Sequence, residues 1–283
     1  MSFSLTTDAR ETFIFAAKNV FRDYETTPPA PEPITGNTWD NVTGNEVKEA
    51  ALALIRDGKD PAKDKSIQEL LLRWQLSQSG IFPVLAAENE NQTLINEFNA
   101  AVKGLEALTP AAEEDAQILA NAASRLTIPN LGDSYSGSPR DAMLHAGARV
   151  ADARLSKYAE AAGTLLYLRG IQVQGEHMTP NWFALAPLTF KDAHRHSLRS
   201  AGTASPWTLA HARINIEPAA NIEEIQERIN AYTTGKRAIE RQVEAALPQW
   251  QNLPRDAYQD AITRAVNGET MRDARGGIVT WAN

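Results

Sequence analysis

The feature that most constrains the fold of this chain is a seam of apolar residues between positions 138 and 170. Its members recur at alternating steps of four and three, the spacing of a helix that packs on another helix; they are Leu144, Ala148, Ala151, Leu155, Tyr158, Ala162 and Leu165. Ser138 is placed to cap the first turn, Pro139 suits the first helical position, and Gly170 suits the residue beyond the last turn. The sequence therefore predicts one helix of about 45 Å, and a helix of that length needs a partner.

A second seam with the same spacing lies downstream, at Ile222, Ile225, Ile229, Tyr232, Lys236, Ile239, Val243 and Ala246. Asn221 with Glu224 resembles a capping box, and Pro248 ends the run. Lys236 interrupts the seam, so we expect the helix to bend there or the lysine to reach an acidic partner or water. We expect the two helices to pack as an antiparallel pair. Both seams either face the core of a larger helical bundle, which is the favoured interpretation, or form a protruding coiled-coil arm.

The N-terminal half has the pattern of several shorter helices. The first is predicted from Asp8 to about Tyr24, and the four prolines of residues 27–33 predict an extended connector after it. Further helices are predicted from capping boxes at Thr43 and Ser66 and from the apolar stripes that follow them. Residues 127–138, rich in Pro, Gly and Ser, are the predicted domain boundary.

The predicted fold class is mainly α, a multi-helical bundle with a pair of long heptad-patterned helices and a small irregular or β-containing cap. The predicted domains are an N-terminal helix with its Pro-rich connector (1–34), a helical bundle (35–137), and the long-helix pair with a C-terminal tail (138–283). The cap is the segment 171–220, inserted between the long helices. Residues 171–174 and 212–216 alternate in the manner of short strands, so a two-stranded ribbon is expected there.

Composition excludes several classes of protein. The chain has no cysteine, so it has neither a disulfide framework nor a thiolate nucleophile. The longest apolar run near the N-terminus, residues 13–17, is too short for a signal peptide or a membrane span, so we expect a cytoplasmic protein that does not bind membranes.

Charge is unevenly distributed along the chain. Residues 1–138 hold 11 basic and 20 acidic residues (net −9), residues 139–214 hold 9 and 5 (net +4), and residues 215–283 hold 8 and 10 (net −2). The basic middle predicts contact with acidic parts of the same or a neighbouring chain, or an anion-binding surface.

The cap combines aromatic with basic residues. Such a set is typical of a minor core, of a docking surface, or of a surface that binds phosphate or single-stranded nucleic acid through charge and stacking. The candidate binding residues are Trp182, Phe190, Lys191, Arg195, Arg199, Trp207 and Arg213.

A metal site is a further alternative in the same cap. On a strand, Asp192, His194 and His196 would share one side and could bind one ion, with His177 or His211 completing the set. On a helix, residues two apart point to different sides, and the surrounding Lys and Arg disfavour a cation. Ordinary polar or core histidines are therefore the favoured interpretation, and no cofactor is expected.

The sequence contains no motif of a catalytic nucleophile and no phosphate-binding loop. We therefore expect a non-enzymatic structural or regulatory protein that associates with proteins, including a second copy of itself. The alternatives are anion or single-stranded nucleic-acid binding by the basic aromatic cap, and a metal-assisted hydrolase that uses the histidine cluster. No resemblance to a known family emerges from these residues.

Overall fold

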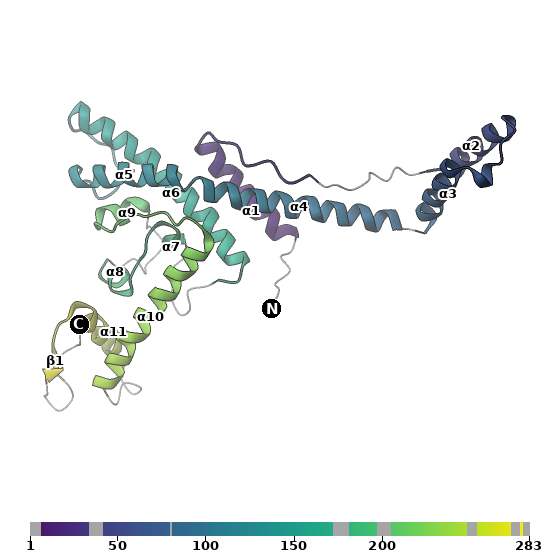
Figure 1. The fold of residues 1–283 in the computed structure, drawn as a ribbon. Coiled ribbons are helices and arrows are strands. Elements are labelled where there is room, and N and C mark those ends of the chain that lie inside the picture. Colours follow the sequence, from purple (N-terminus) through teal and green to yellow (C-terminus); the bar gives the residue numbers. More distant parts are fainter. Residues whose placement is uncertain are drawn as a thin grey trace. The chain divides into compact units, whose positions relative to one another are not determined.

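The protein is mainly helical, as the sequence predicts (Figure 1). The computed structural model describes residues 7–33, 42–79, 81–171, 181–196, 205–247, 254–272 and 278–279. Contacts divide the chain into two units, which we describe separately. Unit 1 contains Met1–Pro29 and Ala101–Asn283, and unit 2 contains Ala30–Ala100.

The helices of unit 1 are α1 (Thr7–Asp23), α5 (Thr109–Arg125), α6 (Pro139–Leu168), α7 (Asn181–Leu185), α8 (Phe190–Arg195), α9 (Pro206–His211), α10 (Ile222–Ala246) and α11 (Arg255–Asn267). Unit 2 contains α2 (Gly44–Arg56), the 3-10 helix η1 (Pro61–Lys63) and α3 (Lys65–Gln78). Helix α4 (Ile81–Ala107) begins in unit 2 and ends in unit 1. Strands β1 (Met271–Arg272) and β2 (Ile278–Val279) pair antiparallel.

Helix α6 is the centre of unit 1, where α1, α5, α7 and α9 all contact it. The predicted seam is buried at Ala148, Ala151, Leu155, Tyr158, Ala162 and Leu165. Residues off the seam are buried as well, namely His145, Ala159, Ala161, Gly163 and Leu166. A helix that is apolar on more than one face packs inside a bundle and not along a single partner.

The predicted antiparallel pairing of the two long helices differs from the observed packing. Helix α7 contacts both α6 and α10, and α10 packs on α7, α8 and α11. Gly163 allows this arrangement because a Cβ at that position would overlap the side-chain amide of Asn181, the first residue of α7. On the other side of α7, Phe183 meets Tyr232 of α10 edge to face, with ring centroids 5.2 Å apart. The α10 seam is therefore buried against short helices.

Two further predictions concern Lys236 and the ribbon in the cap. The Lys236 ammonium lies 3.8 Å from a carboxylate oxygen of Glu240, an acidic partner one turn along α10. The first predicted strand lies outside the described residues from position 172 onward. In the second, 212–216, residues 212–213 form a turn and residues 214–216 have no strand pairing. The chain beyond it bonds to α7 through the Glu217 N–H, which donates to the Leu185 carbonyl at 2.8 Å.

Helix α1 is anchored to unit 1 by its apolar face and by its last turn. Phe13 and Ala17 are fully buried, and the carboxylate of Asp23 pairs with the ammonium of Lys157 on α6. The Arg154 guanidinium lies 5.4 Å from the centre of the Tyr24 ring, immediately after α1. Helix α1 is thus part of the core of unit 1.

Arg228 joins α10 to the cap by hydrogen bonds from a buried guanidinium. Its Nη1 donates to the carbonyls of Phe183 (3.1 Å) and Glu217 (2.7 Å), and its Nη2 donates to the carboxylate of Glu224 (2.5 Å). Glu224 also accepts from the Ala220 N–H at 2.8 Å, just before the first turn of α10. One side chain therefore fixes α10, α7 and the extended segment at residue 217 together.

The close approach of Gly104 to α1 gives a first prediction. A Cβ on Gly104 of α4 would lie 2.6 Å from Cζ of Phe21, which is buried, and 2.9 Å from Cδ of Pro29. We expect Gly104→Ala to lower the free energy of unfolding by about 1 to 2 kcal/mol, because this overlap outweighs the roughly 1 kcal/mol that alanine gains over glycine in a helix. Gly147→Ala in α6 is the matched control, since its Cβ would meet only Ile118 at 3.9 Å. Urea unfolding should show the control unchanged or more stable; equal effects of the two substitutions would refute the steric account.

Glu224 gives a second prediction, on the pH dependence of stability. Burial alone would raise the pKa of this carboxyl, but the Ala220 N–H and the Arg228 guanidinium together lower it below its ordinary value. The stabilisation is therefore fully present above the unfolded-state pKa, about 4.3, and is lost as the pH falls through the lower folded-state value. We expect Glu224→Gln to lower the free energy of unfolding by about 1 kcal/mol at pH 7, because charge-assisted hydrogen bonds are lost. Below the folded-state pKa, where Glu224 is protonated, we expect the substitution to leave the free energy of unfolding unchanged. Urea unfolding across this pH range measures the difference in stability between the variant and wild type. Glu227→Gln, at an exposed position of the same helix, is the control. A Glu224→Gln difference that does not change with pH would contradict the prediction.

Candidate functional site

The predicted aromatic residues of the cap lie in the core of unit 1. Trp182, Phe190 and Trp207 are each at most 6% exposed. Phe190 packs against Tyr232 with centroids 5.7 Å apart, and the Trp207 indole N–H donates to the Ile128 carbonyl at 3.3 Å. Because these rings are covered by protein, they present no faces on which nucleic-acid bases could stack. The burial of these three rings agrees with the interpretation of the cap as a minor core.

The candidate metal ligands do not converge in the described residues. Asp192, His194 and His196 follow a helix, α8, and its C-cap, so they point in different directions. The Asp192 carboxylate accepts from the Thr189 hydroxyl at 2.5 Å, and Nε2 of His194 lies 2.9 Å from the Thr263 hydroxyl. His177 lies outside the described residues. Within the described ranges, no group of three His, Asp or Glu side chains is placed to hold a metal ion.

The candidate basic residues have different environments. Lys191 is half-buried, and Arg195 donates to the Val266 carbonyl at 3.2 Å. Arg199 lies outside the described residues. Arg213 is exposed, just beyond α9, and lines two cavities. Among the basic candidates that the structure describes, Arg213 is therefore the one that shares a cavity with other polar side chains.

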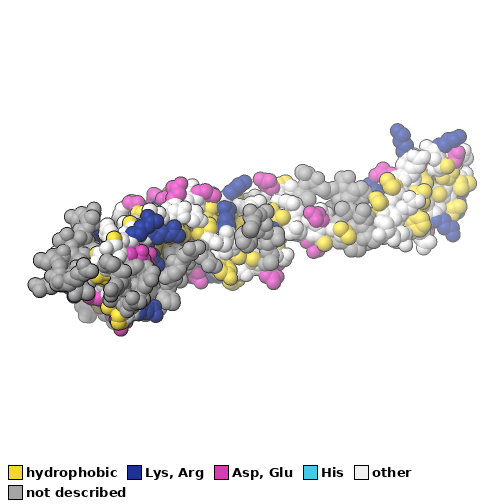
Figure 2. Space-filling model, turned by 90° about the horizontal axis from the view of Figure 1, so that it is seen from below, with side chains coloured by type: hydrophobic (Ala, Val, Ile, Leu, Met, Phe, Trp, Pro, Cys, Tyr) yellow, Lys and Arg dark blue, Asp and Glu magenta, His cyan; other side chains and the backbone are white. Residues whose placement is uncertain are grey.

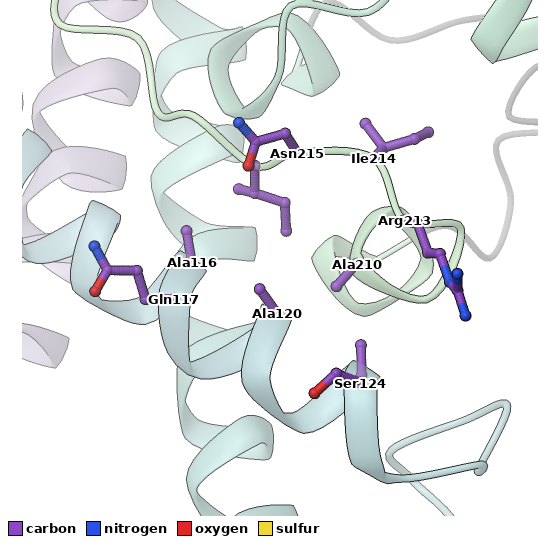
Figure 3. Close-up of a pocket in the computed structure, with 10 residues that line it drawn as sticks. Ala116, Gln117, Ala120, Ser124, Ala210, Arg213, Ile214 and Asn215 are labelled. Carbon is purple, nitrogen blue, oxygen red and sulfur yellow. The ribbon is translucent and has the colours of Figure 1, made fainter.

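The first of these cavities lies between α5 and the segment from Ala210 to Ile216, and its volume is about 530 Å³. Figure 3 shows Ala116 and Ala120 of α5 on one wall and the extended residues Ile214 and Asn215 on the other. Arg213 lies near the Ser124 end of the cavity, and its guanidinium is directed away from Asn215. The small side chains of α5 leave room for this groove, which is mostly apolar apart from its ends.

The second cavity has a volume of about 430 Å³ and shares Arg213 with the first. It is lined by Pro129, His196, Thr208, His211, Ala212 and Arg213. Its polar groups come from the C-cap of α8, from α9 and from Arg213, the residue after the C-cap of α9. Two imidazoles, a guanidinium and a hydroxyl can all donate hydrogen bonds, so the polar lining is a set of donors. The sequence analysis grouped His196 and His211 as possible ligands of one metal ion, but it did not join them with Thr208 and Arg213 in one cavity.

A different surface lies in unit 2, on the α2–α3 hairpin (residues 42–79). None of the side chains of α2 is buried, although the helix carries the apolar face that the sequence predicts. Hydrophobic side chains gather on the face of the hairpin that is seen in Figure 2. We use the name hairpin surface for the exposed large apolar residues of these two helices, which are 39 to 57% exposed: Leu52, Ile55, Leu71 and Leu72. Sequence reasoning assigned this face to the core of a bundle, because an amphipathic pattern is the same whichever chain covers it.

The described residues include no helix with both the length and the apolar character needed to cross a membrane. Small side chains of α5 line the first cavity, and hydrogen-bond donors line the second. The hairpin surface consists of exposed apolar residues. Comparison with protein-family models, with curated proteins and with solved structures finds no match.

Proposed function

We propose that this protein is a non-enzymatic assembly component that associates with a second copy of itself through the hairpin surface. The observation that carries the proposal is α2, a 13-residue amphipathic helix without a buried side chain. Isolated helices of that length are marginal in water, and helices in proteins gain most of their stability by burying an apolar face. The most covered apolar side chains of α2 are only half-buried, and a contact over Leu52 and Ile55 adds apolar burial.

The hairpin has the local features of a folded element. Thr43 and Glu46 form a capping box, with the Thr43 N–H donating to the Glu46 carboxylate at 2.6 Å. The cap of α3 is Asp64 and not Ser66 as predicted, because the Asp64 carboxylate accepts from the Ser66 N–H at 2.9 Å. Such caps contribute about 1 kcal/mol each. The sequence thus specifies both helix starts independently of any contact with the rest of the chain.

The two helices run antiparallel. Gly44, at the start of α2, lies close to the Trp74 indole near the end of α3, since an added Cβ would meet Nε1 at 3.3 Å. In two antiparallel helices that face each other, the residue that follows an inward-facing residue points to the same flank of the pair in both helices. Ile55 follows the half-buried Leu54, and Leu71 follows the half-buried Leu70, so both extend toward one flank of the hairpin. Exposed apolar side chains on one flank are suited to docking against another helical surface.

Charge favours a second copy as the partner. Residues 42–79 contain six basic and six acidic residues, a net charge of zero, whereas the whole chain carries −7. A surface selected for a strongly acidic or basic partner would carry an excess of the opposite charge. Two neutral hairpins meet without net repulsion, and a symmetric dimer of this kind buries the same residues on both copies.

Light scattering on the purified full chain tests this proposal. We expect a mass of twice 31.0 kDa at high concentration, falling toward 31.0 kDa on dilution. The fall is expected because a small apolar contact gives reversible association. A mass that stays at one chain at every concentration would refute self-association, whatever surface is considered.

A further inference from the structure

Arg213 has a backbone conformation that the other helix ends of the chain give mostly to glycine. Its φ is +59°, in the left-handed region, and the Ile214 N–H donates back to the Leu209 carbonyl at 3.0 Å. The same conformation after a helix is carried by Gly58, Gly170 and Gly268, and by one other non-glycine residue in the described ranges, Glu25. A side chain at such a position is strained, and strain of this kind marks functional sites. The arginine therefore occupies a position that favours glycine.

The cavity beside Arg213 collects donors from three places in the chain. His196 follows α8, His211 ends α9, and Arg213 follows α9, with the hydroxyl of Thr208 completing the lining. No carboxylate of the described residues lines this cavity. In a chain whose net charge is −7, such a pocket is a local concentration of groups that attract an anion. A guanidinium and two imidazoles supply N–H donors from which phosphate oxygens can accept hydrogen bonds.

We propose that the cavity lined by His196, Thr208, His211 and Arg213 is a binding site for a small oxyanion of the phosphate class. Arg213 contributes a permanent charge and paired N–H donors, while the two imidazoles and the hydroxyl orient the remaining oxygens. This site lies in unit 1 and is independent of the hairpin surface in unit 2. Its failure would leave the proposed self-association unaffected.

The test is a titration of the full chain with inorganic phosphate at pH 7 and constant ionic strength. The chain has five histidines, so the ring signals in a nuclear magnetic resonance spectrum of histidine-labelled protein can be assigned by single substitutions. We expect saturable shifts of the His196 and His211 rings and not of His145. Chloride at the same ionic strength should not reproduce them.

Arg213→Gly is the decisive variant, because it removes the charge and leaves the conformation that three other helix ends carry. We expect its dissociation constant for phosphate to rise at least about tenfold, with a midpoint of thermal unfolding equal to or above that of wild type. Arg237→Gln, exposed on α10, is the charge-matched control and should bind phosphate as wild type does. His211→Ala gives an independent reading of the same site, with weaker binding expected.

Two results would overturn the proposal. One is a wild-type protein whose histidine rings show no saturable response to phosphate. The other is equal binding by Arg213→Gly and Arg237→Gln, which would place the anion elsewhere on the chain.

Discussion

An Arg228→Leu variant should lose about 2 to 4 kcal/mol of the free energy of unfolding, because removing one member of a buried hydrogen-bonded cluster leaves the others unpaired. The lost guanidinium donates to the carbonyls of Phe183 and Glu217 and to the Glu224 carboxylate. Leucine fills part of the volume but satisfies none of these acceptors. Urea unfolding followed by far-ultraviolet circular dichroism and by tryptophan fluorescence measures the loss.

Arg237→Leu is the control for this prediction. Arg237 lies on the same helix, α10, but is exposed, so its replacement should change stability by less than about 0.5 kcal/mol. Arg228→Lys should recover little, because a single ammonium cannot reach the separate acceptors of a planar guanidinium. If Arg228→Leu and Arg237→Leu were equally stable, the role of Arg228 in fixing α10 to α7 would be disproved.

The second large effect concerns association. We expect the double variant Ile55→Glu, Leu71→Glu to weaken self-association at least about a hundredfold. Each glutamate replaces an apolar contact and, in a symmetric contact, meets the same charge on the partner copy. Both residues are exposed in the single chain, at 57% and 39%, so the fold of the hairpin should persist. Sedimentation velocity across a concentration series gives the dissociation constants.

Met143→Glu, Val150→Glu is the matched control for that variant. It makes the same change in charge at two exposed apolar residues of α6, in unit 1. Association should match that of wild type. If this control dissociated the protein while the hairpin variant did not, the contact would belong to α6.

Much of the helical framework follows from local sequence. The caps at Thr43, Ser138 and Asn221 are all formed as predicted, because a capping side chain and its target N–H are within three residues of each other. The apolar seams of α6 and α10 are buried because periodicity records which residues must leave water.

Long-range arrangement was less accessible to sequence reasoning. The insertion of α7 between the long helices depends on Gly163 and on the approach of Asn181, which no spacing pattern encodes. The seams predicted that α6 and α10 have partners, but burial off the α6 seam shows that those partners lie on several sides. The sequence therefore indicates which faces are apolar but not which element covers each of them.

The two candidate surfaces illustrate the same limit. The apolar face of α2 has the sequence pattern of a core helix, and only the absence of a buried side chain in the folded helix distinguishes it from one. The cavity at Arg213 joins residues from α8 and α9, and its clearest local signal is an arginine in a conformation usually reserved for glycine. That signal requires backbone angles, which the sequence does not provide.

The most direct test of the central claim is energy transfer between two copies of the hairpin. The chain has no cysteine, so Ala53→Cys, at an exposed position of α2 outside the hairpin surface, provides one labelling site. A mixture of donor-labelled and acceptor-labelled chains should show efficient transfer that disappears with excess unlabelled protein. A dimeric mass without transfer, or the absence of a dimer, would contradict association through the hairpin surface.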